Sequence, residues 1–198
     1  MPQLSVSYGA IIAQPGMAFD AELSNRDVVS VVAAENIPFG AYCELRSGYA
    51  SLAYALRDAG TTSSFLPETI GIAMFDPLGV EQSYVPFAVP NTGTGSSAAG
   101  WLAGQKIPFM RRGRIWVLAD GGGTPLNYGA INVWHSSDGT HSRGVFTFTA
   151  PSATPGAEID VAPSCVIWNP DGLSASQLVQ TDPFSNVFKI YPVGINLT

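Results

Sequence analysis

The chain has 198 residues, of which 46% are hydrophobic and 12% charged, and its net charge at pH 7 is −6. Disordered chains combine low hydrophobicity with high charge, and this composition is the reverse of that signature. Nucleic acids and anionic membrane surfaces attract clustered cations, so the net negative charge argues against both as partners.

The N-terminal segment is expected to be an extended arm. Residues 1–19 carry no charge and include Pro15 and Gly16. An apolar terminal arm usually docks, either on its own core or on a neighbouring subunit. We expect the rest of the chain, residues 20–198, to form a single β-rich domain. Because the first basic residue is Arg26, the basic start of a secretory signal is missing, and we expect a protein that is made in the cytoplasm.

Strand patterns begin after residue 26. Residues 28–33 (VVSVVA) are β-branched, and residues 69–75 form another apolar run. In residues 38–46 (PFGAYCELR), apolar and polar side chains alternate, which predicts a half-buried strand.

Strands also dominate the second half of the chain. The strongest candidate is RIWVL at residues 114–118, and residues 130–135 and 142–150 flank the dipeptide Asp138-Gly139, which is a two-residue hairpin signal. Further strands are expected near residues 159–168 and 187–195. Roughly eight to ten short strands with turns between them are typical of an all-β sandwich or barrel.

One polar cluster raises the question of a metal site. His135, Asp138 and His141 lie close in sequence, and such residues can bind a metal. A two-residue turn at Asp138-Gly139 would place the two histidines on opposite faces of the ribbon. We therefore expect a polar hairpin tip, with no metal and no cofactor.

No catalytic residues are expected. Cys43 and Cys165 could pair by count, but a long chain with two cysteines is not a disulfide scaffold, and we expect both to be buried apolar side chains. A Cys43–His nucleophile pair would lack a third group. The carboxylates Glu158 and Asp160 are expected on a solvated strand edge. The sequence thus favours an assembly component over an enzyme.

Arginines are concentrated in one segment. Arg111, Arg112 and Arg114 are three of only nine basic residues. On a strand, Arg112, Arg114 and Trp116 share a face. Arginine and tryptophan are enriched at interfaces, so this segment is either an interface or a site of internal pairing with the acidic residues.

Four blocks occur in a familiar order. They are Pro15-Gly16, the IPFG of residues 37–40, the IGIA of residues 70–73, and the RRGRIWV of residues 111–117. In order and spacing the chain resembles the structural cement proteins of tailed bacteriophages, which decorate the capsid. In that family a short barrel segment follows these blocks, whereas residues 134–180 here look longer and richer in loops.

The resemblance implies a mostly β protein with a jelly-roll or barrel-like core and no catalytic activity. It would bind the outside of an HK97-type shell, stabilise capsomer junctions and lie on the capsid surface of the virion. Its partners would be the major capsid protein and other copies of itself, with a dimer favoured over a trimer.

The residues expected at the capsid or subunit interface come from the arm and from the arginine-rich strand. They are Pro15, Met17, Phe19, Arg111, Arg112, Arg114 and Trp116. The alternative function is a carbohydrate-binding β-sandwich module of a phage tail or surface adhesin, in which tryptophans would stack on sugars. The candidates for that role are Trp101, Trp116, Trp134 and Trp168.

Overall fold

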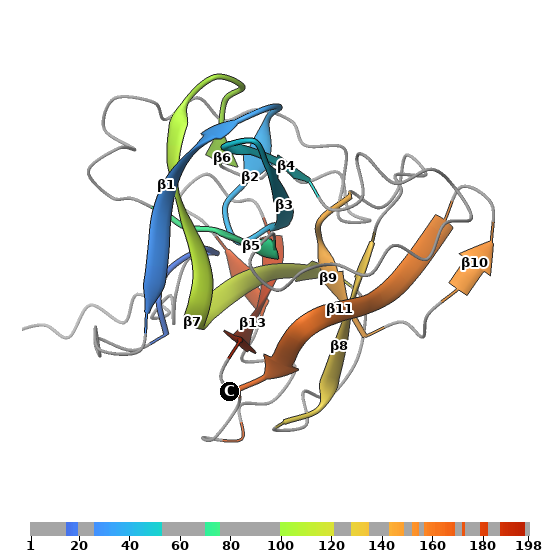
Figure 1. Cartoon of the computed structure of the whole chain (residues 1–198). Helices are drawn as coiled ribbons and strands as arrows, with labels where there is room; N and C mark the ends of the chain where they lie inside the picture. Colours follow the sequence, from blue (N-terminus) through green and yellow to red (C-terminus); the bar gives the residue numbers. More distant parts are fainter. Residues whose placement is uncertain are drawn as a thin grey trace, which may run out of the picture.

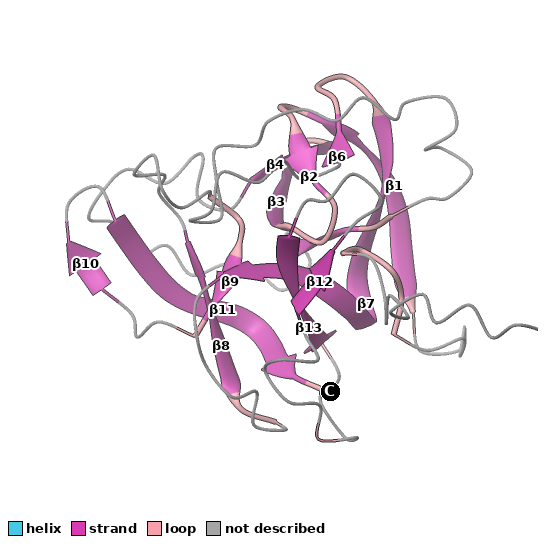
Figure 2. Cartoon of the chain, turned by 180° about the vertical axis from the view of Figure 1, so that it is seen from behind, coloured by secondary structure: helices cyan, strands magenta, loops and turns pink. Residues whose placement is uncertain are grey.

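A computed structural model describes residues 15–19, 26–52, 70–75, 100–120, 128–134, 143–148, 152–154, 157–168, 172, 179–181 and 187–196. All regular structure in these segments is β-strand, as Figures 1 and 2 show. The prediction of an all-β fold is therefore confirmed. None of the described segments forms a helix with the length and apolar character needed to cross a bilayer.

The organising element is β7 (Lys106–Asp120), a strand of 15 residues that curves through the whole molecule (Figure 1). Its first half pairs with β1 (Asp27–Ala33), from Lys106 opposite Val32 to Arg112 opposite Asp27. From Gly113 onward it pairs instead with β13 (Val187–Ile195). Gly113 has a φ of 136°, which a residue with a side chain rarely adopts, so the exchange of partners occurs at a position suited to glycine.

The strand pairings close two five-stranded barrels that share β7. The N-terminal barrel runs in the order β1, β4 (Tyr49–Leu52), β3 (Tyr42–Arg46), β5 (Ile70–Ala73) and β7. The C-terminal barrel runs in the order β7, β9 (Phe146–Thr147), β8 (Ala130–Trp134), β11 (Ala157–Ile167) and β13. The sequence predicts a jelly-roll or barrel-like core, and the strand pairings are those of barrels.

Four shorter strands add to this frame. β2 (Ile37–Pro38) pairs with β6 (Gly100–Trp101), β10 (Ser152–Thr154) pairs with β11, and β12 (Val179–Thr181) pairs with β13. Residues 134–180, where the sequence suggests a loop-rich elaboration, thus supply β9 and β11 to the C-terminal barrel.

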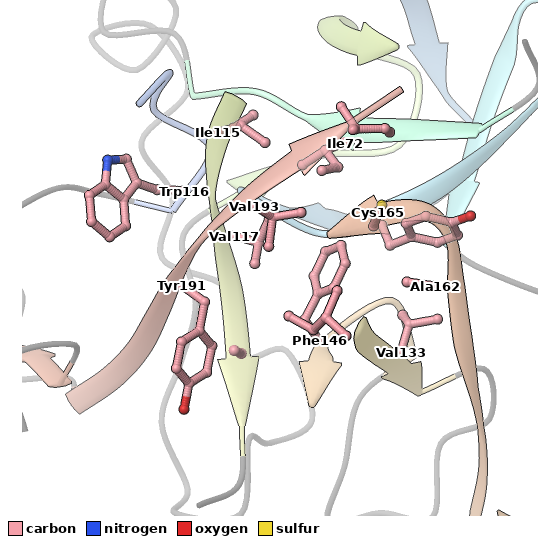
Figure 3. Close-up of a cluster of buried hydrophobic side chains, with 14 of the residues drawn as sticks. Ile72, Ile115, Trp116, Val117, Val133, Phe146, Ala162, Cys165, Tyr191 and Val193 are labelled. Atoms are coloured by element: carbon pink, nitrogen blue, oxygen red, sulfur yellow. The ribbon is translucent and has the colours of Figure 1, made fainter. Parts of the chain in front are cut away.

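The buried apolar side chains form two clusters, and neighbouring residues of β7 point into different clusters. Ile107 and Phe109 of β7 belong to one cluster, together with Cys43 of β3. Met110 of the same strand belongs to the other, which also contains Ile72 and the centre of the C-terminal barrel (Figure 3). The second cluster therefore joins the outer face of the N-terminal barrel to the C-terminal barrel.

This packing corrects one expectation about residues 38–46. The alternation predicts a strand that is buried on one face, but Tyr42, Cys43 and Glu44 are all buried, with Glu44 only 4% exposed. Both faces of β3 are covered because Cys43 faces one apolar cluster and Tyr42 the other. A residue's own sequence neighbours cannot reveal that a second barrel covers its outer face.

Two glycines lie where the chain segments approach most closely. The Gly40 N–H donates to the Ala73 carbonyl at 2.8 Å, and the Leu118 N–H donates to the Gly40 carbonyl at 3.2 Å. Gly40 has a φ of 74°, and a Cβ there would lie 2.7 Å from the Leu118 nitrogen and 2.9 Å from the Gly16 nitrogen.

Gly16 is bound in the same way. Its N–H donates to the Trp116 carbonyl at 2.6 Å, and its carbonyl accepts from the Phe75 N–H at 2.9 Å. A Cβ at Gly16 would lie 2.5 Å from the Phe75 nitrogen. We call this meeting point of Gly16, Gly40, Ala73, Trp116 and Leu118 the glycine junction. It brings together the four sequence blocks, which are far apart along the chain.

The predicted hairpin is present as a strand pair. β8 and β9 are antiparallel, with Asn132 opposite Thr147 and Val133 opposite Phe146. This register is offset by two residues from the one that a two-residue Asp138-Gly139 turn would give. The tip itself, residues 135–142, lies outside the described residues.

Replacing Gly40 should reveal the importance of the glycine junction. Gly104 has a similar φ of 84° but open space where a Cβ would point, so Gly104→Ala should cost about 1 kcal/mol through backbone conformation alone. Gly40→Ala adds a clash with backbone atoms and should cost about 2 kcal/mol more. Chemical denaturation of the two variants measures the difference, and equal losses would contradict the role given to the junction.

Candidate functional site

The two segments expected at an interface lie side by side. Ala18 forms an antiparallel bridge with Ile115, the Trp116 N–H donates to the Met17 carbonyl at 2.8 Å, and the Phe19 N–H donates to the Arg114 carbonyl at 2.9 Å. Residues 15–19 thus dock on their own chain, along β7 on the edge opposite β13. The preceding part of the arm, residues 1–14, lies outside the described residues.

Side chains of the arm differ in exposure. Pro15 is buried, and the half-buried Phe19 ring lies 5.2 Å from the Trp116 ring, which is only 6% exposed. Trp116 points away from Val117 and Phe146 on the opposite side of the sheet (Figure 3). Met17 is the exposed member, at 39%. Pro15, Phe19 and Trp116 thus hold the arm in place, while Met17 remains accessible.

The three arginines have different surroundings. Arg111 forms an ion pair with Asp27 at 2.6 Å, and its carbonyl accepts from Asn196 Nδ2 at 2.7 Å. The side chains of this pair are 30% and 43% exposed, so solvent screens the interaction and limits its contribution to stability. Arg112 is exposed. Internal pairing therefore applies to Arg111, and Arg112 is accessible to a partner.

Arg114 leads to two aromatic residues that the interface prediction did not include. Its guanidinium carbon lies 3.9 Å from the centroid of the Trp168 ring, which is within the range of a cation–π interaction. The Trp168 and Tyr128 rings are perpendicular, with their centroids 5.3 Å apart, and Tyr128 is 63% exposed. Neither aromatic residue is near Arg114 in sequence, so only the β7–β13–β11 pairing brings them together.

The other tryptophans are part of the core. Trp101, Trp116 and Trp134 are 4%, 6% and 5% exposed, and the Trp101 indole N–H donates to the Met74 carbonyl at 2.9 Å. These three rings cannot stack on a sugar in this fold. Trp168 is half-buried, and Arg114 covers its face.

Catalytic and metal candidates gain no support from the geometry. His135, Asp138 and His141 lie outside the described residues, as do the side chains of Glu158 and Asp160. Where the chain is described, no three metal-ligating side chains gather.

The cysteines are buried and free, as expected from their scarcity. Desolvation by burial raises the pKa of both thiols, and at Cys43 the nearby carboxylates Glu35 and Glu44 raise it further. A thiol in these surroundings stays protonated at neutral pH and is a poor nucleophile.

This protonation predicts slow thiol chemistry. At pH 8 both thiols of the folded protein should resist iodoacetamide, because a raised pKa leaves almost no thiolate and burial blocks access. In denaturant both should react, which mass spectrometry would detect. Rapid alkylation of Cys43 in the folded state would contradict the structure.

Comparison with known protein families gives the same family as the four sequence blocks. Residues 2–181 match the family model described as "Structural cement protein (E217 gp24/Pam3 gp6)". The chain belongs to the structural cement protein family. The resemblance seen in the sequence is thereby confirmed, and the cement protein has a capsid-associated structural role in the virion of a bacteriophage.

A solved structure has a similar fold. A chain of "The capsid of Myoviridae Phage XM1" aligns with a TM-score of 0.52 and 16% sequence identity, over 93% of this chain and 90% of that chain. At this identity the likeness establishes a shared fold. No curated protein sequence matches the chain.

The division of the arm into buried and exposed side chains can be tested directly. Phe19→Ala removes the ring that packs on Trp116 and should lower the free energy of unfolding by about 1–2 kcal/mol. Met17→Ala removes an exposed side chain and should change it by less than about 0.5 kcal/mol. Urea denaturation compares the variants, and a neutral Phe19→Ala would contradict the docking of the arm.

Proposed function

We propose that this cement protein binds the outside of an HK97-type shell and stabilises the junctions between capsomers without catalysing a reaction. Membership of the structural cement family carries the proposal. DNA packed in a capsid strains the seams between capsomers. A protein that buries surface on two neighbouring capsomers raises the free energy needed to separate them, and many copies add their effects.

The arm and the arginine-rich strand are the proposed contact region. Met17 and Arg112 are exposed, and the arm residues around Met17 are bound to the strand that carries Arg112 and Arg114. Residues 1–14 carry no charge, and an uncharged apolar segment suits strand addition to the sheet edge of a partner. We assign its partner as the major capsid protein.

The protein would act as a homo-oligomer, with a dimer favoured over a trimer. A seam between two equivalent capsomers has local two-fold symmetry, and a two-fold dimer presents the same contact surface to each side. Two linked contacts also raise the effective concentration of the second one after the first has formed.

Binding to shells tests the proposed function. Purified shells that lack the cement protein are mixed with the full-length chain or with a variant that lacks residues 1–14, and bound protein is measured after sedimentation. The full-length chain should bind to saturation and raise the temperature at which shells release DNA. The truncated variant should bind at least about tenfold more weakly, and thermal unfolding of both proteins checks that the truncated chain still folds.

Two outcomes would contradict the proposal. Failure of the full-length chain to bind shells would exclude the cement function. Full occupancy by the truncated variant would exclude residues 1–14 as the main contact and leave Met17 and the arginine-rich strand as the candidates.

A further inference from the structure

A row of side chains crosses the surface beside the arm. It consists of Arg112, Arg114, Trp168 and Tyr128, and we call it the arginine–aromatic row. Arg112 and Arg114 are two residues apart on β7, Arg114 lies over the Trp168 ring, and the Trp168 and Tyr128 rings form a T-shaped pair. Arginine, tryptophan and tyrosine are the residues that most often contribute large binding energies at protein interfaces.

The aromatic end of the row is held rigidly by the backbone. The Tyr128 N–H donates to the Ile167 carbonyl at 2.8 Å, and the Trp168 N–H donates to the Pro192 carbonyl at 2.8 Å. These bonds tie both residues to β11 and β13 of the C-terminal barrel. A surface that is ordered before binding loses little conformational entropy when a partner arrives.

Tyr128 occupies a backbone conformation that does not favour it. Its φ is 60°, in the left-handed region where glycine or asparagine is preferred. The glycine in this turn is the next residue, Gly129, so the unfavourable conformation falls on the tyrosine. The side chain is 63% exposed and therefore contributes little to the core. The described packing of the ring is the contact with Trp168, which leaves most of the tyrosine surface outward-facing and available to a partner.

Positive charge gathers at the other end of the row. Arg26, Arg111, Arg112 and Arg114 are four of the nine basic residues in a chain of net charge −6. They are close together, because the Arg26 Cγ lies 3.4 Å from where a Cβ on Gly113 would be. Asp27 offsets Arg111, and Arg112 remains exposed. Such a patch attracts carboxylates, which guanidinium groups bind through paired hydrogen bonds.

We propose that the arginine–aromatic row binds an acidic segment of the capsid shell protein, with carboxylates on Arg112 and apolar contact on Tyr128. This inference rests on the proposed function and adds the partner's chemistry to it. A second copy of the chain is the less favourable occupant. Two-fold symmetry brings the same surface patch of each copy together, and the row carries no carboxylate that could pair with Arg112 of the other copy.

Four full-length variants test the row against matched controls. Arg112→Glu and Arg46→Glu change the net charge equally at exposed positions, and Arg46 ends β3 on the N-terminal barrel. Tyr128→Ala and Tyr49→Ala each remove an exposed ring, 63% and 54% exposed. Binding to purified shells should weaken at least about tenfold for Arg112→Glu and Tyr128→Ala, and by less than about twofold for the controls.

The salt dependence of shell binding tests whether charge contributes to the contact. The affinity of the full-length chain should fall as salt rises, and Arg112→Glu should lose part of that dependence. If Arg112→Glu unfolds at a lower temperature, Arg112→Gln takes its place, because it removes the charge without adding repulsion towards Asp27.

Three results would overturn the assignment of the row. If the full-length chain binds shells and the row variants match their controls, only the row is wrong. If sedimentation velocity shows that the row variants dissociate the free protein into smaller species, the row is a contact between copies. If the full-length chain does not bind shells, the proposed function fails as well.

Discussion

The glycine junction is the constraint on which the rest of the structure depends. At this point the arm, the IPFG block, the end of β5 and the second half of β7 exchange backbone hydrogen bonds at 2.6–3.2 Å. Gly40 and Gly16 permit the approach because a Cβ on either would lie within 3.0 Å of neighbouring backbone atoms. A buried backbone group that loses its partner costs free energy comparable to a lost hydrogen bond, so these contacts act together. The junction therefore fixes where the arm leaves the body of the protein.

Sharing β7 couples the two barrels mechanically. Neither barrel closes without this strand, and the outer face of the N-terminal barrel is buried against the C-terminal one. A second tie lies between Arg143, which precedes β9, and Glu35, at 2.7 Å, and Glu35 also accepts from the Leu52 N–H at 2.9 Å. These side chains are about one-third exposed, so the ion pair adds less than the shared core. A shared strand and a shared core of this kind suit the proposed role, in which the protein would hold neighbouring capsomers together.

Buried anchoring residues and exposed residues alternate along one short stretch of surface. Trp116 and Pro15 are buried and hold the arm, Arg111 is paired within the chain, and Met17, Arg112 and Tyr128 face outward. The arm contact on β7 is itself a strand addition within one chain: the Gly16 and Phe19 N–H groups donate to β7, and the Met17 carbonyl accepts from it. The same chemistry would serve an intermolecular contact further along the arm. Residues that anchor the arm and residues proposed to meet a partner therefore lie next to each other, and variants of each kind would distinguish stability from binding.

Local patterns in the sequence determined the strands and the class of the fold. Residues 187–195 form β13 with the predicted bounds, and the β-branched run at residues 28–33 lies within β1, because alternation and β-propensity depend on near neighbours along the chain. Tertiary structure alone decided the rest. The closure of two barrels on β7, the burial of both faces of β3 and the meeting of Arg114 with Trp168 depend on contacts between segments far apart in sequence. The sequence blocks pointed to Arg112, but Tyr128 became a candidate only when its exposure and backbone conformation were known, since both are properties of the folded surface.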